Sequence, residues 1–339
     1  MLAEARVNTA HFIATTLLEQ ILERAKNVRL TIRPGASLIR ANDWDRQLSN
    51  YRESANDYYS VYTFSEDPER KADALIGLSQ ELINLQSLRK AREFLNKAPE
   101  LFQNLPEVKK ILFQAQVEGK KGWIEDYELG YWNELKHFGN AVDILNQIPR
   151  DKWGNDGEEL YSTAKHFSGR ARFWMAASGI DKTQNVYNAI ELFGEAIDLD
   201  ESLDVFTKEE KIGHGYAWMA RCYLLLKDIP LTENLIGRAL YCYGQHEEKV
   251  EKSAVMAHWY ILRGSKNLQV ELLDEAREDF EKAIDIRNRV GQYSQGLAVA
   301  YLGLAEVSRR EGKLGHWAGY TLKAAKINPL VILRGGIGG

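Results

Sequence analysis

Apolar residues along most of this chain recur at the spacing of one helix face. In the stretch Ala276-Arg-Glu-Asp-Phe280-Glu-Lys-Ala283, a small, a large and a small residue stand four and then three positions apart. Such positions lie on one stripe of an α-helix. The same seam recurs at Ala91/Leu95/Ala98, Ala141/Leu145/Ile148, Ala189/Phe193/Ala196, Thr232/Ile236/Ala239 and, less clearly, Trp317/Thr321/Ala324. The six copies predict stacked helical units, each of which buries its seam against its neighbours.

Each seam is placed on the second helix of a helical hairpin. We expect its large residue to fill the gap between the two helices of the preceding hairpin. The first hairpin is predicted to begin near Asp67-Pro68. Before the second, a separate helix is expected at 106–121, with the first helix of that hairpin around 127–132. A helix at 158–167 is expected to lead into the third hairpin, and a long polar connection, 198–211, to precede the fourth.

The two ends of the chain lie outside this pattern, which predicts three regions. Residues 1–66 are expected to form an N-terminal helical cap, with one helix ending near Arg24 and another from Asp43 to Phe64. Residues 67–329 form the repeat array, and residues 330–339 form a Gly-rich tail. Within the tail, Leu333-Arg-Gly-Gly336 looks like the end of ubiquitin. Conjugation through this Gly-Gly tail is an alternative, although the β-grasp fold that presents such a tail is missing from the pattern.

The hairpins resemble tetratricopeptide repeats. That family carries aromatic-x2-Leu-Gly/Ala-x2-Tyr on the first helix and Ala-x3-Phe-x2-Ala on the second. The best copies in this chain are Phe173/Ala177/Ala189/Phe193/Ala196 and Tyr216/Ala220/Tyr223/Ile236/Ala239. The resemblance implies an all-α, right-handed superhelical solenoid of about six repeats. The seams are 41 to 50 residues apart, against about 34 in the standard repeat, so longer helices or loops are expected. Such extended repeats resemble those of kinesin light chains, peptide-pheromone regulators and the sensor arrays of bacterial signal-transducing ATPases.

In that family the first helices line a groove that holds a peptide or a partner's helix. By position, the resemblance places ten residues of this chain there: Trp174, Ser178, His214, Trp218, Arg221, His258, Ser265, Glu306, Arg309 and Arg310. Trp and Arg gathered on one face are typical of a binding hot spot. The alternative is that Trp174 and Trp218 pack between adjacent repeats. The Lys and Asn pattern that clamps a C-terminal carboxylate in some members is absent at these positions, which disfavours chaperone tails.

A second candidate is the concentration of aromatic residues at the irregular second repeat. We expect Trp123, Tyr127, Tyr131 and Trp132, joined by Trp153, to line a hydrophobic pocket where the register changes. The alternative is that these rings only fill space that the irregular repeat leaves open.

Composition and motifs narrow the function. A formal net charge of −4 gives no electrostatic reason to expect nucleic acid or an anionic membrane as a partner. Cys222 and Cys242 form no cluster, so reduced, buried thiols are expected and a zinc site is not. The seven His are scattered, and no P-loop, HExxH or GxSxG motif occurs. No membrane span is predicted.

The prediction is therefore a cytoplasmic, non-enzymatic scaffold or adaptor without metal or cofactor. Its partner would be a protein or peptide, and self-association is open. Two alternatives remain: a peptide- or protein-sensing regulator within a larger signalling or defence assembly, and an enzyme of unrecognised type.

Overall fold

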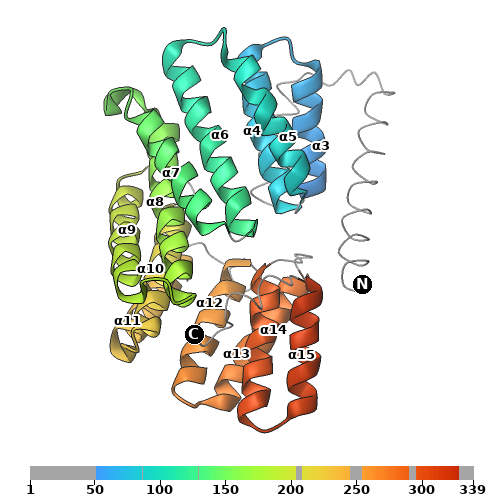
Figure 1. The fold of residues 1–339 in the computed structure, drawn as a ribbon, viewed down its shortest axis with the longest axis vertical. Helices are drawn as coiled ribbons and strands as arrows, with labels where there is room; N and C mark the ends of the chain where they lie inside the picture. The colour runs from blue at the N-terminus through green and yellow to red at the C-terminus, as the bar shows by residue number, and fades with distance from the viewer. Residues whose placement is uncertain are drawn as a thin grey trace. The chain divides into compact units, whose positions relative to one another are not determined.

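The protein is built of helices. A computed structural model describes residues 51–85, 87–128, 130–203, 208–244, 254–289 and 295–327, and these residues form thirteen α-helices and one short 3-10 helix with no strand (Figure 1). The helices are α3 (Tyr51–Phe64), α4 (Pro68–Asn84), α5 (Leu88–Phe102), α6 (Glu107–Glu128), α7 (Tyr131–Leu145), η1 (Arg150–Lys152), α8 (Gly154–Ala177), α9 (Lys182–Ser202), α10 (Lys208–Leu225), α11 (Ile229–Gly244), α12 (Ala254–Gln269), α13 (Leu273–Arg289), α14 (Gln295–Arg310) and α15 (Leu314–Ile327). The chain divides into two compact units, with the boundary after Ala164 inside α8.

Unit 1 contains α3 to α7 and the first part of α8. Helix α4 starts where the sequence predicts, because Asp67 caps it: its Oδ1 accepts a hydrogen bond from the backbone N–H of Glu69 at 3.0 Å, and Pro68 occupies the first turn. Helix α3 packs beside α4, and α6 pairs with α7. The predicted helix ending at Phe64 is thus confirmed at its C-terminal end.

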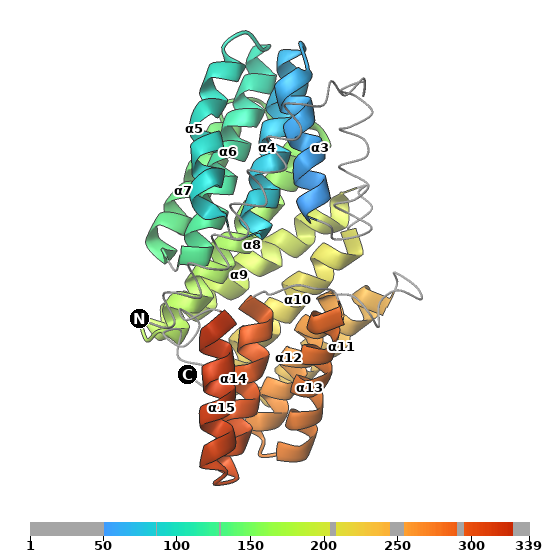
Figure 2. The same ribbon diagram turned by 90° about the vertical axis from the view of Figure 1, so that its right-hand side faces the viewer.

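Unit 2 contains the rest of α8 and α9 to α15. Its consecutive helices pair as hairpins, α10 with α11, α12 with α13 and α14 with α15, and α12 to α15 lie side by side in Figure 2. One continuous core runs from α10 to α14, and a smaller one joins α14 to α15. The prediction of an all-α repeat array is confirmed in this respect.

The predicted seam is buried on the second helices before α15. On α15 only Ala324 of the sixth copy is buried, and Trp317 is 41% exposed. Ala276, Phe280 and Ala283 have no exposed surface, and the same holds for the seams on α5 and α9. The sequence-based placement of the large residue is wrong in one detail, however. The Phe280 ring lies against Gly264 of its own hairpin and Gly303 of the following one, where an added Cβ would come within 3.0 and 2.5 Å of the ring. Glycines on the first helices α12 and α14 leave space for the Phe280 ring, which therefore packs against two consecutive hairpins.

Three predicted boundaries are wrong, for the same physical reason. Helix α6 is continuous over 22 residues and is itself the first helix of the second hairpin, whereas 127–132 holds its end and the start of α7. Helix α8 is likewise one helix of 24 residues. Helix α9 continues to Ser202, and α10 begins at Lys208, so most of 198–211 is helical. Longer helices account for the long intervals between seams, because buried contacts sustain helices across polar stretches.

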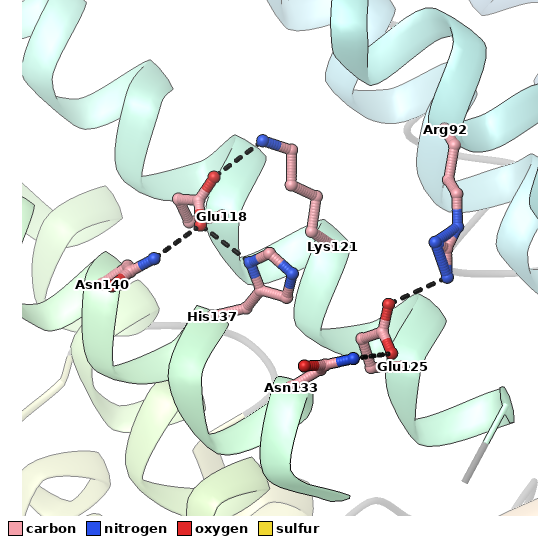
Figure 3. A network of polar contacts seen from close by, with 7 residues as sticks. All are labelled: Arg92, Glu118, Lys121, Glu125, Asn133, His137 and Asn140. Carbon is pink, nitrogen blue, oxygen red and sulfur yellow. Dashed lines mark hydrogen bonds and ion pairs between the residues drawn. The ribbon is translucent and has the colours of Figure 1, made fainter. Parts of the chain in front are cut away.

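A polar network joins α6 and α7 inside unit 1 (Figure 3). The Glu118 carboxylate contacts His137 Nδ1 at 2.8 Å and accepts from Lys121 Nζ at 2.7 Å and Asn140 Nδ2 at 3.2 Å. The hydrogen bond with His137 is the largest cause that lowers the pKa of Glu118, to about 2. The ionised form is therefore the one that the fold stabilises.

We expect Glu118→Gln to destabilise unit 1 at neutral pH by up to about 3 kcal/mol, since the folded pKa lies below the ordinary value. The contribution is complete above the unfolded-state pKa and is lost as the pH falls through the folded one. Urea unfolding of both proteins at a series of pH values from 7 to 3 measures it. The wild-type advantage should shrink on acidification, and an advantage that is absent at pH 7 or constant with pH would contradict the assignment.

Some predictions fall on residues that the structure does not describe: the helix ending near Arg24, the start of the helix at Asp43, and the Gly-rich tail with its Gly-Gly sequence.

Of the cysteines, Cys222 is a free, buried thiol and Cys242 a free, half-buried one.

Within the described ranges, none of the helices has the length and apolar character needed to cross a membrane.

Candidate functional site

Five of the ten predicted groove residues meet in unit 2. Trp174 comes from α8, His214, Trp218 and Arg221 from α10, and His258 from α12. The Trp174 and Trp218 ring centroids are 6.0 Å apart, and that of His258 is 5.8 Å from Trp218. The first helices of three consecutive hairpins therefore bring together side chains that lie far apart in sequence.

Trp218 stands at the centre of this group. Its ring stacks on Phe193 at 6.1 Å and meets Phe173 edge-on at 5.5 Å. Trp174 and Trp218 are only 9% and 8% exposed. Both tryptophans thus pack between neighbouring repeats, as the alternative interpretation of the sequence predicts. Their part in partner binding stays a prediction.

Two guanidinium groups lie over the same indole. Arg170 is 5.2 Å and Arg221 5.1 Å from the Trp218 ring centroid. Cations are attracted to the face of a tryptophan ring, more strongly when water is excluded. Tyr243 of α11 joins through its hydroxyl, which lies 3.0 Å from His214 Nδ1. We call Arg170, Trp174, His214, Trp218, Arg221, Tyr243, His258 and Arg287 the Arg221 cluster.

The charge of Arg221 is not balanced by the part of the chain that the structure describes. Its Nε is shielded from solvent and has no hydrogen-bond partner there. Burial lowers the pKa of Arg221 to about 10, and the other groups acting on it are Tyr243, Arg170 and Cys222, none of them a carboxylate. Since a guanidinium stays protonated at neutral pH, burying it without a counter-charge costs on the order of several kcal/mol.

The pKa of His258 is lowered by burial and by several of the same positively charged groups. Its pKa lies well below the ordinary value, first because of burial and then because of Arg221, His214, Arg287 and Arg170. The imidazole is therefore neutral at pH 7. Its Nε2 is also shielded and without a hydrogen-bond partner among the described residues. As whole residues, Arg221 and His258 keep part of their surface accessible, while Arg221 Nε and His258 Nε2 are shielded.

The chemistry available in this cluster is anion recognition. Within the described ranges, no group of three or more His, Cys, Asp or Glu could hold a metal ion. Cys222, on the same helix, is an inert thiol because burial raises its pKa far above the ordinary value. Donors and aromatic faces are what the cluster offers to a ligand.

The other five predicted groove residues have different surroundings. Ser178 is exposed just after α8, and the Ser265 hydroxyl donates to the Ile261 carbonyl at 2.7 Å. On α14, Arg309 and Arg310 both donate to Glu306, at 2.6 and 3.0 Å. Arg310 also donates to the Leu268 carbonyl. Their charges are matched within the chain, in contrast to Arg221, and their predicted contact with a partner is untested.

The predicted aromatic pocket of the second repeat stays a prediction. Trp123 and Tyr127, on α6, pack partly against the main core of unit 1. Trp153 is buried in a separate core with Tyr161, where its indole donates to the Leu145 carbonyl at 3.0 Å. Trp132 is 64% exposed at the start of α7, beside Tyr131. Trp153 thus lies in a different core from Trp123 and Tyr127, and 127–132 is a helix boundary rather than a first helix.

Sequence reasoning missed three members of the Arg221 cluster. Arg170 lies four residues before Trp174, and this helical spacing would have placed it on the same face. Tyr243 and Arg287 come from the second helices α11 and α13. Positions taken from first helices alone could not find them.

Two surface hollows lie outside the Arg221 cluster. One of about 330 Å³ lies between α5, α6 and α7 and is lined by Glu118, Lys121 and Asn140 among others. In that hollow the Glu118 carboxylate already has three hydrogen-bond partners within the chain, His137, Lys121 and Asn140. Another, of about 620 Å³, is lined by Tyr216, Tyr241 and Cys242 with other residues of α9 to α11. Neither offers an unbalanced charge comparable with that of Arg221.

Comparisons with known proteins reveal structural neighbours. No family model matches the chain, and no curated protein matches its sequence. The apo form of RapI aligns with a TM-score of 0.59 and 11% identity over 87% of this chain and 98% of RapI. Aspartyl phosphate phosphatase F from Bacillus subtilis gives 0.62 and 12% over 89% and 71%. A Rap protein complexed with competence and sporulation factor gives 0.60 and 15% over 88% and 80%.

At these identities the likeness concerns the fold alone. The neighbours support a helical repeat fold of the tetratricopeptide type, in agreement with the residue pattern of the second helices. The chain is thus a helical-repeat protein in whose second unit the Arg221 guanidinium has no carboxylate partner among the described residues.

Proposed function

We propose that this chain is a non-enzymatic scaffold or adaptor that holds a segment of a protein or peptide against the first helices of unit 2. The observation that carries the proposal is Arg221, whose Nε is shielded and whose charge has no carboxylate partner among the described residues, beside Trp218 and His258. Residues kept at a cost to stability are typical of binding sites. One of the structural neighbours is itself a complex with competence and sporulation factor, which adds support from a protein of the same fold.

Selection from a random peptide library displayed on phage tests this proposal. The immobilised full chain should enrich peptides, and amide hydrogen exchange with a synthetic enriched peptide should map where it binds. We expect slower exchange in 165–177, α10 and α12, because ligands stabilise the segments that they contact. Protection confined to unit 1, or no enrichment over an uncoated support, would overturn the proposal.

A peptide-sensing regulator is the second candidate. Its support is the same unbalanced charge, since a ligand that neutralises Arg221 would stabilise the bound form of unit 2 relative to the free form. A change in the radius of gyration on adding the enriched peptide, measured by small-angle X-ray scattering, favours the regulator. An unchanged radius favours the scaffold.

A further inference from the structure

We propose that the Arg221 cluster is a subsite for a carboxylate group carried by the bound segment, with the Arg221 guanidinium as its anchor. The inference rests on the proposed function, because it names the chemical group that the peptide-binding surface recognises.

The missing charge is seen by comparing the arginines of unit 2. Arg263 is paired with Asp279, Arg277 with Glu311, and Arg309 with Glu306. No carboxylate is among the described groups that act on Arg221. The Glu210 carboxylate lies 3.6 Å from His214 Nε2, on the opposite edge of the ring from Tyr243, and is not among the groups that act on Arg221. An anion from outside the chain would supply what Arg221 lacks.

The donor geometry favours a carboxylate. The Nε–H of a guanidinium and a neighbouring terminal N–H point in parallel and match the two oxygens of a carboxylate. The Nε of Arg221 is shielded and has no partner among the described residues, whereas its terminal nitrogens are not shielded, so a carboxylate would meet the terminal N–H groups first. The neutral His258 is shielded at Nε2 in the same way and could donate from there only after a small rearrangement.

The surroundings make such a bond strong. Trp218 covers one side of the guanidinium, and Trp174 and Phe173 pack on Trp218. Charge-assisted hydrogen bonds are worth more where apolar groups exclude water. A neutral ligand would leave the Arg221 charge unbalanced, and a cation would be repelled. Inorganic phosphate offers similar oxygens, so it belongs among the probes.

Nitrogen-15 labelling of arginine gives a direct test on the intact chain. The Nε–Hε signal of Arg221, assigned by its loss in Arg221→Met, is followed while probes are added. N-acetylglutamic acid α-amide carries a side-chain carboxylate, N-acetylalanine carries a terminal one, and N-acetylglutamine amide is the neutral control. We expect a saturable shift with one or both carboxylates and none with the neutral control. The probe that binds more tightly shows whether the recognised carboxylate comes from a side chain or from a chain terminus.

Three outcomes overturn the carboxylate subsite: no shift with either carboxylate, an equal shift with the neutral control, or a saturable shift with phosphate alone. The Arg277 signal serves as the internal reference, since that guanidinium is held by Glu311 and lies outside the predicted groove. It should not move.

Thermal unfolding of the free protein adds an independent readout. Arg221→Met removes an unbalanced charge and keeps an apolar stem over Trp218, so we expect its midpoint to be at or above that of the wild type. Arg309→Met is the matched control, with little change. A fall in the midpoint of Arg221→Met would mean that the charge is balanced within the folded chain, and would contradict the proposal.

The two proposals can fail separately. If the enriched peptide protects the first helices of unit 2 but the small carboxylates leave the Arg221 signal unmoved, peptide binding stands and the carboxylate subsite falls. If the carboxylates shift the signal but no peptide is enriched, the anion site stands and peptide binding falls.

Discussion

Replacing Phe280 by alanine is expected to lower the stability of unit 2 by about 3–5 kcal/mol. The ring has no exposed surface and fills the space between Gly264 and Gly303. Neither glycine has a side chain that could move into the cavity, so little of the loss can be recovered by relaxation. Urea unfolding followed by circular dichroism and tryptophan fluorescence measures the change.

Leu322→Ala is the control for this substitution, because Leu322 is a large apolar residue of the same unit that is mostly exposed. Its effect should stay within about 0.5 kcal/mol. Phe193→Ala should resemble Phe280→Ala, since Phe193 fills the equivalent position against Gly169. An unfolding midpoint that neither phenylalanine substitution lowers would show that the seam is assigned to the wrong helix face.

Removing the partner of a buried carboxylate should have a comparable effect. Asp279 is 1% exposed and accepts from Arg263 Nε at 2.9 Å and from Asn267 Nδ2 at 3.0 Å. Arg263→Met would leave this carboxylate with the Asn267 amide as its main remaining donor. We expect a loss of about 3–5 kcal/mol in the free energy of unfolding, as for other broken buried ion pairs.

The double variant Arg263→Met/Asp279→Leu separates the cost of the isolated charge from the loss of packing. It should recover most of the stability, because both charges are gone and apolar groups replace them. A double variant as unstable as Arg263→Met alone would attribute the loss to the packing of the arginine stem on Trp259, 4.3 Å from the guanidinium. Arg263 and Arg221 are expected to respond in opposite directions to the same substitution.

The repeat seams could be predicted because they depend on local spacing. Ala276, Phe280 and Ala283 share one helix face whatever surrounds the helix, and their burial follows from the stacking that the spacing requires. The boundaries of α6 and α8 could not be predicted in the same way. No proline or other strong breaker divides them, and the family motif around Tyr127 suggested a first helix where the structure has a turn.

The candidate site could be predicted only in part. Trp218 and Arg221 stand three residues apart on one helix face, so their common direction follows from the sequence. The approach of Arg170 and His258 depends on how the hairpins stack, and the absence of a counter-charge at Arg221 depends on every neighbouring side chain. Sequence spacing carries neither kind of information.

The affinity of an enriched peptide for three proteins tests the central claim most directly. Isothermal titration calorimetry would compare the wild type with Arg221→Met and with Arg277→Met, a control on the second helix α13 whose guanidinium is already paired with Glu311. We expect binding about 10- to 100-fold weaker for Arg221→Met, the loss of one charge-assisted contact, and within about twofold of the wild type for Arg277→Met. Equal affinities for all three proteins, or equal losses in both variants, would contradict it.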